Sequence, residues 1–448
     1  MPVFRDENDL EVTAASSATV RALDRFGQAL LGFSAKVDTI VAVADADPEC
    51  PTAQCFAAQY HASAETADGM ATARTYLARA ESLAKLASPR EKAMIKAAEH
   101  WCRNERSTAA RVLEAVLDDH PADVVNAKWA QALHYDTGNA AGILRAPLKV
   151  AMRCDGNAYV HGMLAFGFEE CHLIDQAEQS VKRAISLKRA EPWAHHAMAH
   201  INEARHTLED GIGFMLEMSD TWTGLTSFMS THNWWHICLF LIDLGRIDEV
   251  LEHFDKQVWA RNHGCVQDQI NAISLLYRLE RIGVDVGDRW ASVAKAAVEN
   301  AGSQISVFLD FQFLYALARA GRPEAEPMAE RITQRAETAN PDERIAWRDV
   351  AAPIAPGILA LAKRDFPMAV RQIAKARPSL QSIGGSHAQR ELVALFYIDA
   401  LRGAGEWSKV QQILSQRRRA RPKTSWIKAQ LSEAYSNLGL AQVIALNG

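Results

Sequence analysis

A chain of 448 residues, of which 48% are hydrophobic and 23% charged, has the composition of an ordinary globular protein with a large core. Its net charge of −5 predicts no nucleic-acid partner, because nucleic-acid binders usually display a basic face. The N-terminus lacks the apolar core of a signal peptide, and no run approaches about 18 uncharged apolar residues. We therefore expect a soluble, cytoplasmic protein without a membrane partner.

Two compositional details are interpreted as structural. The seven cysteines form no C-x-x-C pair and are widely scattered, which favours reduced, mostly buried thiols over disulfides or a structural zinc site. A basic cluster near the C-terminus is predicted to be a solvated turn and not a polyanion contact. Its members are Arg417, Arg418, Arg419, Arg421 and Lys423.

Almost every segment has a 3.6-residue apolar rhythm, and alternating β-type runs are hard to find. The fold is therefore predicted to be all-α. Ser88-Pro89-Arg90-Glu91 is a typical helix start, with a serine cap, proline at the first helical position and glutamate closing a capping box. From there, degenerate units with a period of about 34 residues predict a right-handed α-solenoid of tetratricopeptide-like helix pairs.

No low-complexity linker divides the chain, so we expect a single helical-repeat domain over residues 1–448. Residues 1–87 are predicted to form helices that cap the stack, residues 88–423 the helix pairs, and residues 424–448 a C-terminal capping helix. The run from Gly384 to Arg390 lacks both phosphate-loop patterns. It is predicted to be a glycine turn that opens a helix capped by Ser386.

Two probable helices in the middle of the chain carry acid/base side chains at one-face spacing. At about 100° per residue, His196, His200 and Glu203 fall within about 60° of arc. The second set lies within about 40° and consists of His232, His236 and Asp243. Ten of the 15 histidines lie between His161 and His263, so we expect any chemistry to lie there.

Four runs of sequence resemble the tetratricopeptide-repeat-protein-38-like family, in order and from about Ala87 to the C-terminal helix. They are G-M-L-A-F-G-F-E-E from Gly162, W-A-H-H-A-M-A-H-I-N-E from Trp193, H-N-W-W-H-I-C-L-F-L-I-D-L-G-R from His232, and G-G-S-H-A-Q-R from Gly384. One departure is Phe168, where the family pattern suggests leucine. The resemblance implies a helical-repeat fold and a motif that fits His196, His200, Glu203, His232, Asn233 and His236, but no particular reaction.

Three interpretations of the two polar stripes remain open. In the first, the imidazoles are buried packing groups that bond to backbone or water. In the second, His200 or His236 is a general base, the other steadies negative charge, a carboxylate fixes the tautomer, and Asn233 donates from its amide. In the third, histidines at i and i+4 bind a divalent metal. The candidate ligands are then His196, His200, Glu203, His232 and His236. The cofactor expectation is accordingly none or a divalent metal.

A set of further residues is predicted to bind the substrate: Trp193, Trp235, Asp243, His387 and Arg390. Together these features predict a central His/Glu/Asp pocket for a small organic molecule on the concave face, with hydrolase or lyase-type acid/base chemistry. The alternative is a scaffold that binds a peptide or protein in its groove without catalysis. Self-association into a homo-oligomer is left open.

Overall fold

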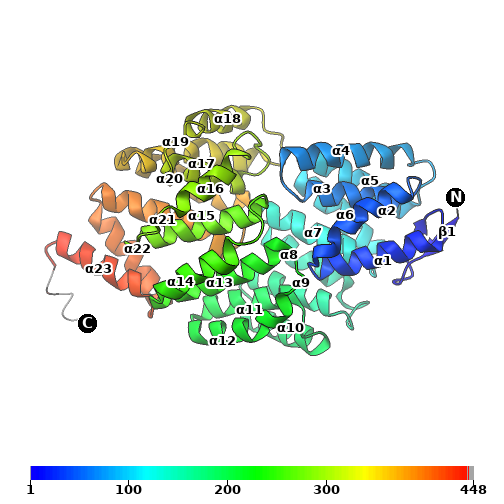
Figure 1. The fold of residues 1–448 in the computed structure, drawn as a ribbon, viewed down its shortest axis with the longest axis horizontal. Helices are drawn as coiled ribbons and strands as arrows, with labels where there is room; N and C mark the ends of the chain where they lie inside the picture. The colour runs from blue at the N-terminus through cyan, green and yellow to red at the C-terminus, as the bar shows by residue number, and fades with distance from the viewer. Residues whose placement is uncertain (1, 441, 443–448) are drawn as a thin grey trace.

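The computed structural model describes residues 2–440 and 442, and within them the chain is almost entirely helical (Figure 1). The prediction of an all-α solenoid is confirmed. One element was not expected, a small antiparallel hairpin of β1 (Val3–Arg5) and β2 (Glu11–Thr13). Its strands are three residues each, too short to give a recognisable alternating pattern.

The first half of the chain consists of helices joined by short turns. They are α1 (Ser17–Leu31), η1 (Ala35–Asp38), α2 (Thr39–Ala46), α3 (Pro51–Ala62), α4 (Ala67–Ser82), α5 (Pro89–Cys102), α6 (Arg106–Asp119), α7 (Val124–Asp136), α8 (Ala140–Ala151), α9 (Ala158–Glu170), α10 (Ile174–Leu187), α11 (Pro192–Arg205) and α12 (Leu208–Met218). The predicted start at Ser88 is confirmed, since Ser88 and Glu91 form a complete capping box on α5.

The second half continues in the same way. Its elements are η2 (Ser219–Trp222), α13 (Ser227–Leu244), α14 (Ile247–His253), η3 (Phe254–Val258), α15 (Val266–Glu280), α16 (Arg289–Val298), α17 (Val307–Arg319), α18 (Ala325–Glu337), η4 (Ala346–Ala351), α19 (Ala352–Ala362), α20 (Phe366–Ala376), η5 (Arg377–Ile383), α21 (His387–Gly403), α22 (Trp407–Ala420) and α23 (Ser425–Asn437).

The helices form two layers. Each pair of consecutive helices packs together, as in α5 with α6 and α9 with α10, and alternate helices also touch along the series α9, α11, α13, α15, α17 and α19. Helices of this inner series are buried around most of their circumference, whereas α10 and α20 bury only a stripe of small and branched residues. The two polar stripes lie on α11 and α13, so the fold places them in the inner layer.

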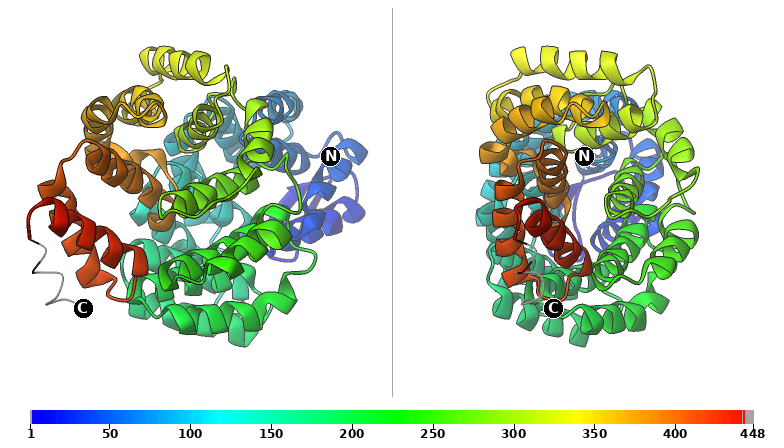
Figure 2. Two further views of the ribbon diagram at one scale, coloured as in Figure 1. Left: turned by 60° about the vertical axis from the view of Figure 1, so that its left-hand side comes forward. Right: turned by 90° about the vertical axis from the view of Figure 1, so that its left-hand side faces the viewer.

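The solenoid curves until its last helices meet the inner layer of the first half (Figure 2). Tyr135 on α7 donates to the side-chain oxygen of Gln389 on α21, and α23 packs against α13. Gln381 donates to the carbonyl of Gly138 at 2.9 Å. We call these contacts between α7 and the η5–α21 segment the seam. The η5–α21 segment thus closes against the turn after α7 and the end of that helix.

The glycine turn before α21 is confirmed, and the seam explains why it must be glycine. Ser386 caps α21 in a capping box with Gln389. Gly384 and Gly385 both have φ of +77°, and a Cβ on Gly384 would lie 2.5 Å from the carbonyl oxygen of Asp136. A side chain there would therefore push the two ends of the solenoid apart.

The buried apolar side chains form two clusters that meet at the inner layer. One runs from Val12 to Ile201 with two later residues, and the other from Ala199 to Ala434. Helices α11 and α13 contribute to both. The polar stripes therefore lie where the two hydrophobic cores meet, a place where apolar packing alone would be expected.

Candidate functional site

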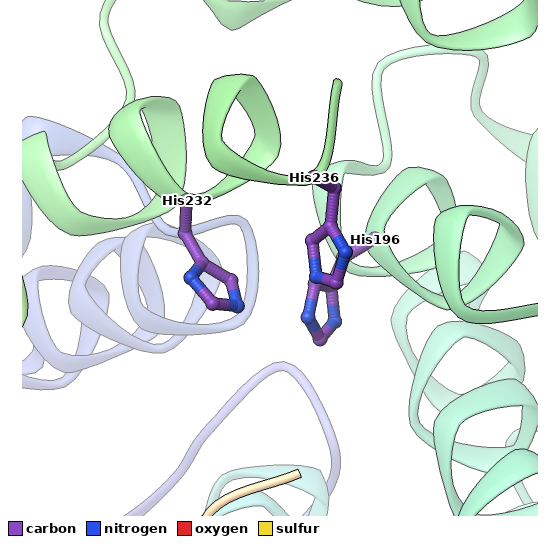
Figure 3. A group of neighbouring side chains, drawn as sticks. All are labelled: His196, His232 and His236. Carbon is purple, nitrogen blue, oxygen red and sulfur yellow. The ribbon is translucent and has the colours of Figure 1, made fainter. Parts of the chain in front are cut away.

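Four imidazoles from α11 and α13 converge in the interior, and Figure 3 shows three of them, His196, His232 and His236. His196, His200, His232 and His236 are each at most 2% exposed. The ring centroids of His196 and His236 lie 5.0 Å apart, and those of His200 and His236 lie 4.6 Å apart. The one-face spacing on each helix therefore brings together the histidines of the two sets.

A chain of hydrogen bonds fixes the tautomer of His232. Thr231 donates its hydroxyl to Asp268 at 2.7 Å and accepts from the Asn271 amide nitrogen at 3.4 Å. The Asn271 side-chain oxygen is thereby turned toward His232 Nδ1, 3.0 Å away. Because an amide oxygen only accepts, Nδ1 of His232 carries the proton and Nε2 carries the lone pair.

A second contact orders the other pair. His200 Nε2 lies 3.1 Å from His196 Nε2, and His200 Nδ1 lies 3.5 Å from the carboxyl of Glu169. We assign the His200 proton to Nδ1, facing this carboxyl, so that His196 donates from Nε2 to the lone pair of His200. This assignment leaves the lone pair of His196 on Nδ1.

Several polar atoms of the cluster have no protein partner. Within the described part of the chain, neither ring nitrogen of His236 has a hydrogen bond, and nor does Nδ1 of His196. Burial, followed by the neighbouring imidazoles, holds the pKa of both rings well below the ordinary value, and burial lowers the pKa of His232 to about 4. The rings are therefore neutral at physiological pH, with lone pairs available to a ligand.

An internal cavity of about 290 Å³ adjoins the cluster. His196 and His232 line it, whereas His200 and His236 lie behind them. Its volume is close to the lower end of the range of about 300–1,000 Å³ for small-molecule sites. Most of the wall is apolar, and its aromatic part is contributed by Phe33, Tyr60, Trp101, Trp129, Tyr135, Phe166, Trp193, Phe228 and Phe308. We call it the aromatic cavity.

One cation, Lys128, also lines the aromatic cavity. Its ammonium group lies 4.1 Å from the centre of the Trp193 ring and 4.5 Å from that of Phe33. Burial lowers the pKa of Lys128 to about 7, although Glu191 raises it, and burial raises the pKa of Glu191 to about 7. Burial therefore disfavours the charged form of both groups, and their mutual attraction favours it.

The carboxylates of the predicted stripes point elsewhere. Glu203 forms an ion pair with Arg421 at 2.9 Å. Asp243 accepts from Thr424 at 3.1 Å and from the indole of Trp426 at 3.0 Å. Arg421 also pairs with Glu391. We call this set the carboxylate network, and it joins the far ends of α11 and α13 to the segment before and within α23.

The carboxylate network corrects the interpretation of the basic cluster as a solvated turn. Arg417, on the last turn of α22, pairs with Glu391 at 2.5 Å, and Arg421 is only 24% exposed. Sequence spacing could not reveal the ion pairs of Arg417 and Arg421, because their acidic partners lie 26 to 218 residues away along the chain.

The remaining predicted residues are dispersed around the cluster. Trp193 lines the aromatic cavity and stacks on His196 at 4.4 Å, whereas Trp235 stacks behind His232 and donates to Ser274. His387 and Arg390 lie 3.6 and 3.7 Å from the Glu170 carboxyl. Asn233 is fully buried, and its amide finds no hydrogen-bond partner among residues 2–440 and 442.

Sequence reasoning missed several residues of this site. Asn271 and Asp268 lie on α15, and Asn271 follows His232, the histidine that it orients, by 39 residues. Nothing in their local pattern marks them. Lys128 gave a weak signal, since it is a single cation within the otherwise uncharged run V-V-N-A-K-W-A-Q-A-L. Glu169 and Glu170 belong to one of the runs that carry the family resemblance.

Comparison with known proteins adds little to this geometry. No family model matches the chain. Among solved structures, the human IFIT1 dimer with m7Gppp-AAAA is similar at 13% identity and a TM-score of 0.36, over 84% of this chain and 76% of that one. The prediction of no nucleic-acid partner is corrected, because this similar protein has a nucleic-acid ligand; at that TM-score the likeness assigns none to the present chain. None of the described helices is long and apolar enough to cross a membrane.

Proposed function

We propose that this helical-repeat protein binds one small organic molecule in the aromatic cavity and transforms it by general acid/base chemistry. The observation that carries the proposal is a cavity of about 290 Å³ with two neutral imidazoles, His196 and His232, in its wall. An apolar wall with a few convergent polar groups is typical of a small-molecule site. The motifs shared with the tetratricopeptide-repeat-protein-38-like family supply residues on two sides of this cavity, which supports membership of that family as part of the proposal.

His232 is the residue best suited to act as the base. Its Nδ1 proton is held by Asn271, so its Nε2 lone pair can accept a proton from the ligand while the chain Asn271–Thr231–Asp268 steadies the imidazolium that forms. We expected His200 or His236 in this role from the sequence. Because those rings lie behind the wall, we assign the role to His232.

Lys128 completes the chemistry. A buried ammonium beside Trp193 and Phe33 can bind a carbonyl or carboxylate oxygen and stabilise negative charge that develops there. A base on one part of the wall and a cation on another suit hydrolysis, elimination or ring opening of a carbonyl compound. The competing role, a scaffold that grips an extended peptide, is disfavoured because the imidazoles and Lys128 gather around one cavity instead of along several repeats.

A cavity-filling substitution tests the binding. Ala132 lines the aromatic cavity, so Ala132→Leu should abolish binding of ligands that stabilise the wild-type chain in a thermal-shift screen of small carbonyl compounds, aromatic acids and nucleotides. Ala71→Leu, the same change on the exposed face of α4, is the matched control. Ligands that stabilise Ala132→Leu as strongly as wild type would exclude the cavity as their site.

A second variant tests the chemistry. For a ligand that is turned over, His232→Gln should lower kcat by about 10²–10⁴-fold, with ligand affinity changed far less. His195→Gln is the control, because His195 is equally buried but its ring bonds to the Arg189 carbonyl and to Trp222. Equal loss of kcat in both variants would assign His232 a structural role only.

A further inference from the structure

The three imidazoles of His196, His232 and His236 offer more lone pairs than the protein itself uses. One ring nitrogen from each lies within 4.8 Å of the other two, and Figure 3 shows the three rings directed into a common space from two helices. A neutral imidazole carries one donor and one acceptor nitrogen. Each such atom that is buried without a hydrogen-bond partner costs about 1–3 kcal/mol. Without a ligand, the three imidazoles would therefore destabilise the fold relative to apolar side chains in the same place.

The hydrogen bonds around the cluster prepare the rings to bind a metal. Ligating histidines usually donate their second N–H to a carbonyl or carboxyl group, which fixes the tautomer. His232 does so toward Asn271 at 3.0 Å. His196 donates to His200, which faces Glu169. These bonds leave the lone pair of His232 on Nε2 and that of His196 on Nδ1. Nδ1 of His196 and both ring nitrogens of His236 have no hydrogen-bond partner within the described residues.

We propose that His196, His232 and His236 bind one divalent first-row transition ion, such as Zn²⁺, in the wall of the aromatic cavity. Three imidazoles without a carboxylate or thiolate suit Zn²⁺, Co²⁺, Ni²⁺ or Cu²⁺ and not Mg²⁺ or Ca²⁺. Bonds of about 2.0–2.1 Å place tetrahedral ligands about 3.4 Å apart. Because the nitrogens lie within 4.8 Å of one another, each ring has to move by at most about 0.8 Å to reach that spacing.

The position of the ion would leave its fourth coordination site open. His196 and His232 both line the aromatic cavity, so the side of the ion not covered by imidazole faces the space where the organic ligand is proposed to lie. Three histidines with one open position are the arrangement of catalytic rather than structural zinc. The role of the open coordination site rests on the proposed function, whereas the assignment of the three histidine ligands does not. The bound ion would occupy the His232 Nε2 lone pair that acts as the base in the metal-free protein. It would instead supply the chemistry by polarising a carbonyl oxygen or lowering the pKa of a bound water.

Cobalt titration of the untagged, full-length chain after chelator treatment tests the site directly. We expect one Co²⁺ per chain, with visible absorption of tetrahedral intensity that is lost when Zn²⁺ displaces it. His232→Ala and His236→Ala should each weaken Co²⁺ binding by more than about 100-fold, because each removes a direct ligand, whereas Asn271→Leu should weaken it by about 10–100-fold, because it removes only the orienting bond.

His195→Gln, with a satisfied imidazole on the same helix, should bind Co²⁺ as wild type does, and circular dichroism identifies variants that fail to fold. A folded wild-type chain that takes up less than one Co²⁺ overturns the site whatever the variants do, as does unchanged binding in His232→Ala and His236→Ala. Metal-free protein also separates the two proposals, because the Ala132→Leu comparison reports on the cavity without an ion.

Discussion

Helices α11 and α13 each carry polar groups at two ends, and the two ends differ in how those groups are satisfied. At one end His196 and His232 line a cavity and His236 lies behind them. His196 and His236 carry ring nitrogens that no described residue engages. At the other, the carboxylates of Glu203 and Asp243 are bonded to groups from the C-terminal segment. The sequence stripes contained both ends. We infer that the hydrogen-bonded carboxylates stabilise the fold and that the imidazoles without hydrogen bonds bind a ligand.

The largest effect should come from breaking the partnered end at its centre. Arg421→Met leaves both Glu203 and Glu391 without their main counter-charge, and we expect a loss of about 3 kcal/mol in the free energy of unfolding, at the low end for a buried pair because Arg421 is partly exposed. Urea denaturation measures it. A loss below about 1 kcal/mol would mean that the carboxylate network is no more than a surface contact.

The pH dependence of the same network gives a second, smaller effect. Burial alone would raise the pKa of Glu391, but Arg421 and Arg417 hold it well below the ordinary value of 4.5. The ionised carboxylate therefore stabilises the fold above about pH 4.5, and this contribution is lost as pH falls through the lowered pKa. Glu391→Gln should cost about 2 kcal/mol at pH 7. The difference between the two chains should stay constant down to about pH 5 and shrink below it; a difference that grows in acid would contradict the assignment.

A milder substitution in the carboxylate network removes one of the two hydrogen bonds that Asp243 accepts. Asp243→Asn keeps an oxygen for Trp426 or Thr424 but not for both, so we expect a loss of about 1 kcal/mol. Because these bonds lie away from the aromatic cavity, thermal shifts caused by cavity ligands should match those of wild type. Lost ligand binding in this variant would show that the two ends of the helices are coupled.

The smallest effect on stability is expected at the unpartnered end. His236→Leu replaces a buried imidazole whose nitrogens have no bond with an apolar group of similar size, and the metal-free chain should be unchanged or more stable by up to about 1 kcal/mol. Its melting temperature in the presence of a chelator measures this. Destabilisation by 2 kcal/mol or more would place His236 among the structural groups.

The sequence predicted the helices far better than the chemistry between them. Caps such as Ser88 and Ser386 act over three residues, so their helices begin where predicted. One-face spacing on two neighbouring helices also predicted that His196 and His232 meet, and their ring centroids lie 5.0 Å apart. The separation of Glu203 and Asp243 from that cluster was not, since it depends on Arg421 and Trp426, which reach α11 and α13 only through closure of the solenoid.

The seam gives the proposed site a dynamic consequence. Gln389 and Gly385 line the aromatic cavity, and Gln389 also accepts a bond from Tyr135, on the opposite side of the seam. A ligand that contacts residues on both sides of the seam stabilises its closed state, because opening the seam would break the ligand's contacts with one side. Amide hydrogens of η5 and the first turn of α21 should then exchange with solvent more slowly in the loaded protein than in the empty one, so the ring would be tightest while it is occupied.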